Sequence, residues 1–131
     1  MQKKIIITGD GSPSLYISEL NETYHSKHGA VTESNYVYIK RGLGHWLDQN
    51  KQKKLKVFEM GMGTGLNVYL SYVFSINHKI SCEYFSIEKY PLPLKEIRSL
   101  NMKVSLPAIE HHHFFDQLHQ LEWNQMLSQS D

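Results

Sequence analysis

The chain has 131 residues, a length typical of a single domain, and its 40% hydrophobic content is sufficient for one core. Its net charge of +1 excludes a polyelectrolyte that binds nucleic acid through bulk charge alone. No apolar run is long enough to span a bilayer, and the single cysteine fits a reducing cytoplasm.

The N-terminal residues predict a small β-hairpin. Residues 3–8 are mostly β-branched and predict a strand, residues 9–13 have strong turn chemistry, and residues 15–17 predict the return strand. The polar, histidine-containing stretch 21–30 follows neither the helical nor the strand period and predicts a loop.

A helical segment is predicted from about Thr32, where apolar residues begin to recur on one face. These residues are Tyr36, Ile39, Leu43, Trp46 and Leu47, and we expect Tyr36 to pack in the core. Gly42 and Gly44 leave two shorter helices as an alternative to one. Residues 1–56 hold nine Lys/Arg against five acids, which suits either a lobe facing nucleic acid or a solvated lysine-rich loop.

The next unit carries the most informative pattern. Residues 55–60 predict a buried strand, a glycine turn occupies 61–65, and helical spacing begins at Leu66. A second strand is predicted at 82–87 and ends at Glu88. This order of strand, glycine loop, helix, strand and acid is typical of the first half of a doubly wound, nucleotide-binding α/β sheet.

The remaining residues are weakly patterned. Residues 102–109 predict a short strand, and residues 111–127 predict a wholly or partly helical segment. Trp46 and Trp123 are expected in the core, and Cys82 is expected to be a packed thiol rather than a nucleophile. Three consecutive histidines, 111–113, point in different directions on a helix or a strand, so no metal site is predicted there.

The glycine turn predicts close approach of the backbone to a ligand. Gly61, Gly63 and Gly65 allow a sharp turn from strand to helix without the steric obstruction of a Cβ. Glu59 lies at the end of the first strand, and Glu88 follows the second strand, where a carboxylate would reach the ribose of an adenosine. A glycine-rich turn without a ligand is the competing interpretation.

The spacing of the glycines argues against a dinucleotide. The dinucleotide fingerprint places its third glycine three residues after the second, whereas here the separation is two and Leu66 follows. The Gly-Lys-Ser/Thr ending of a phosphate loop is absent. Residues 59–65, an acid followed by alternating glycines, instead resemble motif I of class I methyltransferases, which bind S-adenosylmethionine.

Four stretches, 10–16, 22–34, 58–67 and 84–92, resemble in the same order the MnmC-like tRNA methyltransferases. The resemblance covers roughly residues 8–125. It implies an α/β fold of the Rossmann-like class I S-adenosylmethionine-dependent methyltransferase type, with an incomplete doubly wound sheet and a small N-terminal extension of hairpin and helix. It also implies methylation of the aminomethyl group on a modified wobble uridine in tRNA.

The resemblance further implies the site residues. Those expected to bind the cofactor are Glu59, Gly61, Gly63, Thr64, Gly65, Leu66, Asn67, Glu88 and Lys89. Those expected near the cofactor or the substrate uridine are Tyr24, His25, Gly29 and Glu33. The family places its catalytic aspartate in a later Asp-Ala-Phe-Ala-Pro-like segment, which is not found in this sequence, so no catalytic residue is assigned.

We therefore expect residues 1–50 to form the extension and residues 51–131 to form the first half of the cofactor-binding domain, together making one structural unit. The chain is interpreted as a truncated portion of such an enzyme, whose intact form would bind tRNA and work with a fused or separate FAD-dependent oxidoreductase. A methyltransferase of a small molecule and a non-catalytic binding module remain alternatives.

Overall fold

The structure, a computed structural model, describes residues 1–129, so the last two residues of the predicted unit 51–131 lie outside the described range. The chain begins with an antiparallel sheet of β1 (Lys3–Ile7), β2 (Pro13–Ile17) and β3 (Glu22–Thr23). The predicted hairpin is confirmed, with Ile5 opposite Leu15. The predicted loop 21–30 is wrong at its start, because Glu22 and Thr23 pair with the end of β2.

One continuous helical segment follows, made of α1 (Ala30–Glu33), the π-helix η1 (Ser34–Gly44) and α2 (His45–Gln49). A π-helix bonds residue i to residue i+5, so its side chains do not follow the 3.6-residue period used for the prediction. Tyr36 is consequently 50% exposed, and its predicted place in the core is wrong. The glycines of this segment do not divide it into two helices.

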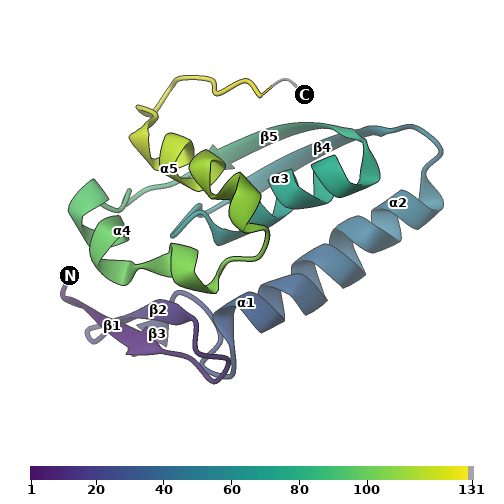
Figure 1. Ribbon diagram of the computed structural model, residues 1–131. Helices are drawn as coiled ribbons and strands as arrows, with labels where there is room; N and C mark the ends of the chain where they lie inside the picture. The colour runs from purple at the N-terminus through teal and green to yellow at the C-terminus, as the bar shows by residue number, and fades with distance from the viewer. Residues whose placement is uncertain (130–131) are drawn as a thin grey trace.

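The strand–loop–helix–strand order predicted from the sequence is present. Strand β4 (Lys54–Met60) leads through the glycine loop into α3 (Leu66–His78), and β5 (Ser81–Ile87) returns parallel to β4. Figure 1 shows α3 alongside this strand pair, with the long segment from α1 to α2 on its other side, and α3 and η1 are in contact.

The C-terminal part is helical: α4 (Leu94–Leu100), the 3₁₀ turns η2 (Met102–Ser105) and η3 (Ile109–His111), and α5 (His112–Gln120). The strand predicted at 102–109 is wrong, because residues on both sides of Pro107 form helical turns instead of extended chain. Proline lacks the N–H that a strand ladder requires. The predicted helical content after residue 111 is confirmed only as far as Gln120.

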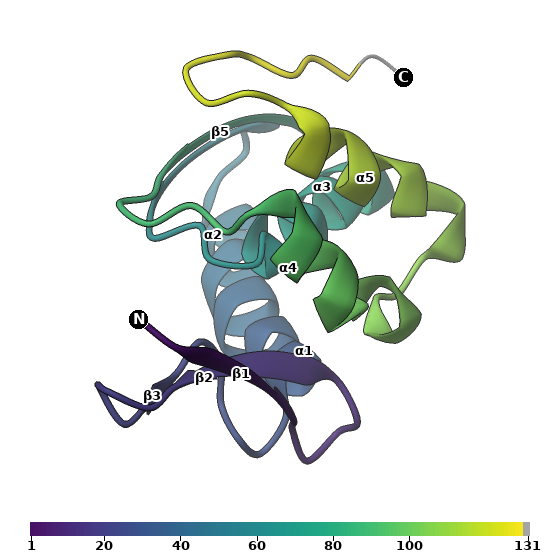
Figure 2. The same cartoon turned by 90° about the vertical axis from the view of Figure 1, so that its left-hand side faces the viewer.

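Helix α3 forms the centre of the core. Its Tyr69 is fully buried and packs edge-to-face against Phe115 of α5, and helix α4 adds Ile97 and Leu100. Figure 2 shows α3 and α4 between the N-terminal sheet and β5. A smaller cluster joins Leu43, Leu55, Phe74 and Ile80, with Trp46 and Cys82 packed against it. The core position predicted for Trp123 is wrong, because this side chain is 44% exposed.

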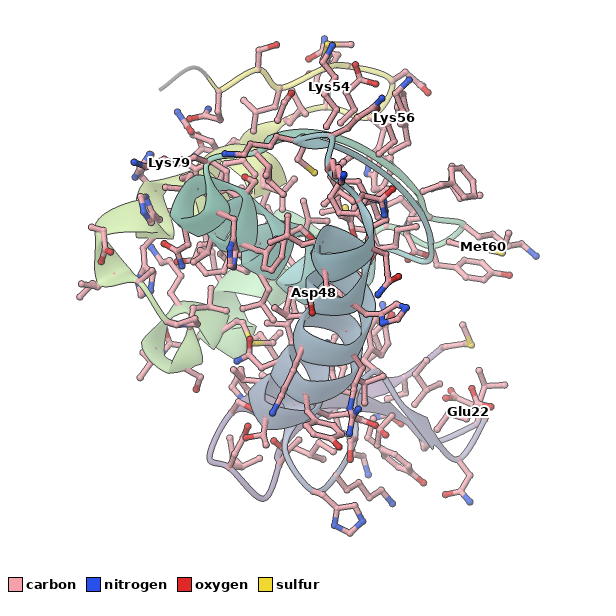
Figure 3. All side chains as sticks on the ribbon, turned by 90° about the vertical axis from the view of Figure 1, so that its right-hand side faces the viewer. Glu22, Asp48, Lys54, Lys56, Met60 and Lys79 are labelled. Atoms are coloured by element: carbon pink, nitrogen blue, oxygen red, sulfur yellow. The ribbon has the colours of Figure 1, made fainter. Side chains whose placement is uncertain are left out.

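One face of the β4–β5 pair is open, and it is apolar at the C-terminal ends of the two strands. The cross-strand neighbours Phe58 and Phe85 are 66% and 57% exposed, and the next pair, Met60 and Ile87, is 80% and 48% exposed. Met60 projects outward from the end of β4 in Figure 3. Parallel sheets are ordinarily covered on both faces, so this face is unusual for its type. Among residues 1–129, no helix has the length and apolar character needed to cross a membrane.

Candidate functional site

The glycine loop between β4 and α3 has the backbone conformation that its sequence predicts. Gly61, Gly63 and Gly65 have φ values of +88°, +56° and +80°, a region that residues with a Cβ rarely adopt. Gly61 is exposed, and a Cβ built on it would meet no described atom within 4 Å. The backbone at Gly61 is thus open to close approach by a ligand.

Two carboxylates flank this loop at the C-terminal ends of the parallel strands. Glu88, just after β5, accepts hydrogen bonds from the backbone N–H groups of Gly63 (3.0 Å) and Tyr90 (2.9 Å). Glu59, near the end of β4, accepts a hydrogen bond of 2.7 Å from the Ser86 hydroxyl. In open α/β sheets, ligands bind outside the carboxyl ends of the strands, which is where these groups lie.

Glu59 is half-buried, and burial raises the pKa of its carboxyl, although hydrogen bonds from Ser86, Tyr84 and Asn67 act in the opposite direction. Asn67, in the first turn of α3, has a buried Oδ1 that accepts no hydrogen bond within the described part of the chain. An unpaired buried amide oxygen is costly, and a ligand that donates a hydrogen bond would remove that cost.

Tyr24 and His25, which follow β3, lie next to the glycine loop, and their predicted place near a ligand stays a prediction. A Cβ on Gly63 would lie 3.2 Å from Cδ2 of Tyr24. The Nε2 atom of His25 lies 3.1 Å from Oγ1 of Thr64, and its Nδ1 lies 2.9 Å from Oγ of Ser14. Burial lowers the pKa of His25 to about 4.

Gly29 and Glu33 make contacts away from the glycine loop. A Cβ on Gly29 would lie 2.9 Å from the Asp10 carboxyl carbon, and Glu33 accepts a hydrogen bond of 3.1 Å from the N–H of Ser26. The adjacent turn caps α1 by accepting the first backbone N–H groups of the helix on side-chain oxygens. These bonds are Ala30 N–H to Thr8 Oγ1 (3.0 Å), Val31 N–H to Ser12 Oγ (3.2 Å) and Thr32 N–H to Asp10 Oδ2 (2.8 Å).

The remaining predicted residues differ in what they can offer a ligand. Thr64 and Leu66 are each only 1% exposed, and Leu66 belongs to the main hydrophobic core. Lys89 is exposed, and its Nζ lies 5.2 Å from the centre of the Tyr90 ring.

No pattern in the sequence indicates His119 of α5, which also reaches the loop. Its Nε2 lies 2.9 Å from the carbonyl oxygen of Thr64, and a Cβ on Gly65 would lie only 3.0 Å from that nitrogen. Burial lowers the pKa of His119. Glycine at position 65 is therefore required both by its φ and by the approach of this ring.

The histidine run does not converge on one point. His112 Nε2 lies 3.0 Å from the Leu106 carbonyl oxygen, while His111 packs edge-to-face on Tyr72. Both rings are half-buried rather than fully on the surface. Within residues 1–129, no group of three or more His, Cys, Asp or Glu side chains is arranged to hold a metal ion.

Two clefts lie between helices, and the glycines of the loop do not line either of them, although His119 of the first also approaches Gly65. One, of about 240 Å³, is lined by residues of α4, η2 and α5, including Arg98, Met102 and His119. The other, of about 550 Å³, lies between η1 and α3 and includes Ile39 and Phe74. The candidate site is consequently an open loop at the strand ends rather than one of these clefts.

No protein-family model matches the chain. Curated proteins match the chain. The tRNA 5-methylaminomethyl-2-thiouridine biosynthesis bifunctional protein MnmC of Campylobacter fetus is 29% identical over 103 residues, which cover 78% of this chain and 16% of that protein. The protein of the same name from Leptospira interrogans is 30% identical over 83 residues, 60% of this chain and 13% of that protein. The chain thus spans no more than about a sixth of these relatives' length.

A solved structure supports the same relationship. The crystal structure of MNMC2 from Aquifex aeolicus superimposes with a TM-score of 0.56 at 31% sequence identity, covering 75% of this chain and 35% of that one. Sequence and fold agree, and the chain is a distant homologue of the MnmC proteins.

Proposed function

We propose that this chain is the S-adenosylmethionine-binding first half of a Rossmann-like class I methyltransferase, with residues 1–50 as an N-terminal extension. The observation that carries the proposal is the exposed, left-handed backbone at Gly61 between two strand ends that bear Glu59 and Glu88. The homology to MnmC proteins supports the same assignment.

The residues at the loop fit the chemical groups of this cofactor. The unpaired Oδ1 of Asn67 and the carboxylate of Glu59 are acceptors for the ammonium of the methionine part. Glu88 uses both oxygens on backbone N–H groups, yet a carboxylate has about four acceptor positions and retains room for the ribose hydroxyls. The cofactor supplies an electrophilic methyl on its sulfonium, and these residues bind and orient it.

A matched pair of glycine variants tests the cofactor proposal. Gly61→Val places a side chain where the ligand would approach, while Gly11→Val has a similar φ (+84°) and equally open surroundings in the N-terminal turn. Both variants incur the left-handed strain of about 1–2 kcal/mol. We expect only Gly61→Val to lose S-adenosylmethionine binding in titration calorimetry; equal loss, or no loss, in the two variants would remove the proposal.

We propose tRNA as the substrate, with the aminomethyl group of a modified wobble uridine as the methyl acceptor. The printed name of the relatives, the family resemblance of the sequence and one surface feature support this proposal. Exposed Tyr36 has the Lys40 and Arg41 cations 5.9 and 5.3 Å from its ring centre. An aromatic ring beside two cations suits contact with an unstacked base and its phosphates.

The tRNA proposal predicts binding that weakens steeply with salt, because phosphate contacts release counterions. Tyr36→Ala and Arg41→Gln should each reduce tRNA affinity and leave cofactor binding unchanged. Tight cofactor binding without salt-dependent tRNA binding would instead favour a small-molecule methyltransferase. The word "bifunctional" in the relatives' name supports the further proposal that an FAD-dependent oxidoreductase, fused or separate, acts with this protein.

A further inference from the structure

Thr64, in the middle of the glycine loop, is contacted by two histidines that are far apart in the sequence. His25 follows the N-terminal sheet and reaches the Thr64 hydroxyl at 3.1 Å, while His119 of α5 reaches its carbonyl oxygen at 2.9 Å. Thr64 is 1% exposed, so water does not replace either contact readily. One loop residue is thus held from two directions.

The hydrogen-bond partners fix the proton position on His119 and give His25 a bridging role. A carbonyl oxygen can only accept, so Nε2 of His119 donates to Thr64. Ser14 Oγ accepts the backbone N–H of His25 (3.1 Å) and lies 2.9 Å from Nδ1 of the same residue, where it can donate its O–H or accept Nδ1–H. The neutral His25 ring has one donor and one acceptor nitrogen, so in either tautomer it bridges the hydroxyls of Ser14 and Thr64.

The surroundings keep both rings neutral at pH 7. Burial lowers the pKa of His25 to about 4, with Glu33 as the charged group that acts against it. Burial also lowers the pKa of His119, opposed by its bond to Thr64 and by Asp116. His119 therefore keeps the Nε2 proton that its contact with the Thr64 carbonyl needs, and His25 keeps one donor and one acceptor for its two hydroxyl partners.

We propose that His25 and His119 are positioning residues that hold the glycine loop in its ligand-ready conformation through Thr64. The fully buried Ser14 links β2 to the loop through His25, and the close fit of His119 against Gly65 links α5 to it. A loop fixed beforehand loses less conformational freedom on binding, so the pair raises cofactor affinity. Only this last consequence rests on the proposed function.

The test uses the whole chain without cofactor. Imidazole ¹⁵N NMR at pH 7 should show a neutral ring for His25 and the Nε2–H tautomer for His119. Thr64→Val removes the hydroxyl and keeps the shape and the carbonyl, so it should shift the His25 signals and leave those of His119. Amide exchange at Gly63 and Gly65 should accelerate about tenfold, the equivalent of one hydrogen bond.

Two control variants separate positioning from general destabilisation. Thr64→Ser restores a hydroxyl and should return the His25 signals and the exchange rates close to wild type. Ser71→Ala removes another buried hydroxyl of α3, which bonds to the Tyr38 hydroxyl (2.8 Å) and the Asn67 carbonyl oxygen (2.7 Å) but not to Thr64, and should leave the loop exchange unchanged. If Thr64→Val does not fold, the wild-type spectrum still decides, since an Nδ1–H tautomer at His119 or a protonated His25 ring at pH 7 overturns the proposal.

Cofactor titrations then complete the test. S-Adenosylmethionine should bind Thr64→Val about tenfold more weakly than Thr64→Ser. Unchanged His25 signals and unchanged exchange in Thr64→Val would refute the positioning role. If those changes appear as expected but wild-type chain binds no S-adenosylmethionine, the positioning role stands and the proposed function fails.

Discussion

Protonation of His25 should make the stability of this protein depend strongly on pH. Its ring is held between Ser14 and Thr64 in a form that carries one proton, and burial lowers its pKa from 6.5 to about 4. Between these two values the unfolded chain binds more protons than the folded one. The stabilisation is therefore complete above about pH 6.5 and is lost as the pH falls toward 4.

The magnitude follows from the two pKa values. Each pKa unit corresponds to about 1.4 kcal/mol, so lowering the pH from 7 to 4 should cost about 3 kcal/mol of unfolding free energy through His25 alone. Carboxylates also titrate in this range, so wild type must be compared with His25→Gln. The difference in unfolding free energy between the two proteins should change by about 3 kcal/mol across this interval.

Urea denaturation followed by tryptophan fluorescence at pH 7, 6, 5 and 4 measures this difference. His28→Gln is the matched control, because His28 lies three residues away and is exposed. Its pH profile should follow that of wild type. A constant difference between wild type and His25→Gln from pH 7 to 4 would refute the burial and hydrogen-bonding argument.

Three further changes test the packing. Tyr69→Phe removes the hydroxyl that donates to the carbonyl oxygens of Pro107 (2.6 Å) and Ala108 (3.0 Å). Urea denaturation should therefore show a free energy of unfolding lower by about 1–2 kcal/mol, and an unchanged value would contradict this. Phe58→Ser replaces an exposed ring, so it should change the free energy of unfolding by less than about 0.5 kcal/mol and reduce the binding of a hydrophobic dye. A large loss of stability would mean that this face of the sheet is covered. Asp10→Asn weakens the cap of α1 and should destabilise the protein by about 1–2 kcal/mol at pH 7. Hydrogen bonds from Ser12 and Thr32 hold the pKa of the Asp10 carboxyl low despite burial, so the difference in unfolding free energy between variant and wild type should shrink in acid. A difference independent of pH would contradict this explanation.

The part of the fold that the sequence predicts well is the part governed by local rules. The glycines at 61, 63 and 65 all adopt positive φ, as their positions between strand and helix require. The β-branched run at the N-terminus forms a strand, and the turn after it forms a hairpin. These features depend on neighbouring residues and are visible in any short window of sequence.

The features that the sequence missed depend on long-range contacts or on an unusual local geometry. A 3.6-residue period predicts that Tyr36 lies in the core, but the π-helix does not keep this period and the side chain is exposed. Trp123 was placed there by its type alone. His119 joins the site through a contact 55 residues away in sequence, and no spacing rule connects it to Thr64.

The turn that contains Thr8, Asp10 and Ser12 has a structural role that the sequence does not indicate. Thr8, Asp10 and Ser12 accept the first N–H groups of α1, so this turn is needed to begin the helix. The predicted role of Gly29 and Glu33 near a ligand stays a prediction, and their recorded contacts are with Asp10 and Ser26.

The most direct test of the account is equilibrium dialysis of the folded wild-type chain against labelled S-adenosylmethionine, with competition by S-adenosylhomocysteine and by NAD. The glycine spacing, the carboxylates at the strand ends and the unpaired Asn67 oxygen predict one bound S-adenosylmethionine per chain, displaced by S-adenosylhomocysteine and not by NAD. Displacement by NAD, or a folded chain that retains no label, would contradict the account.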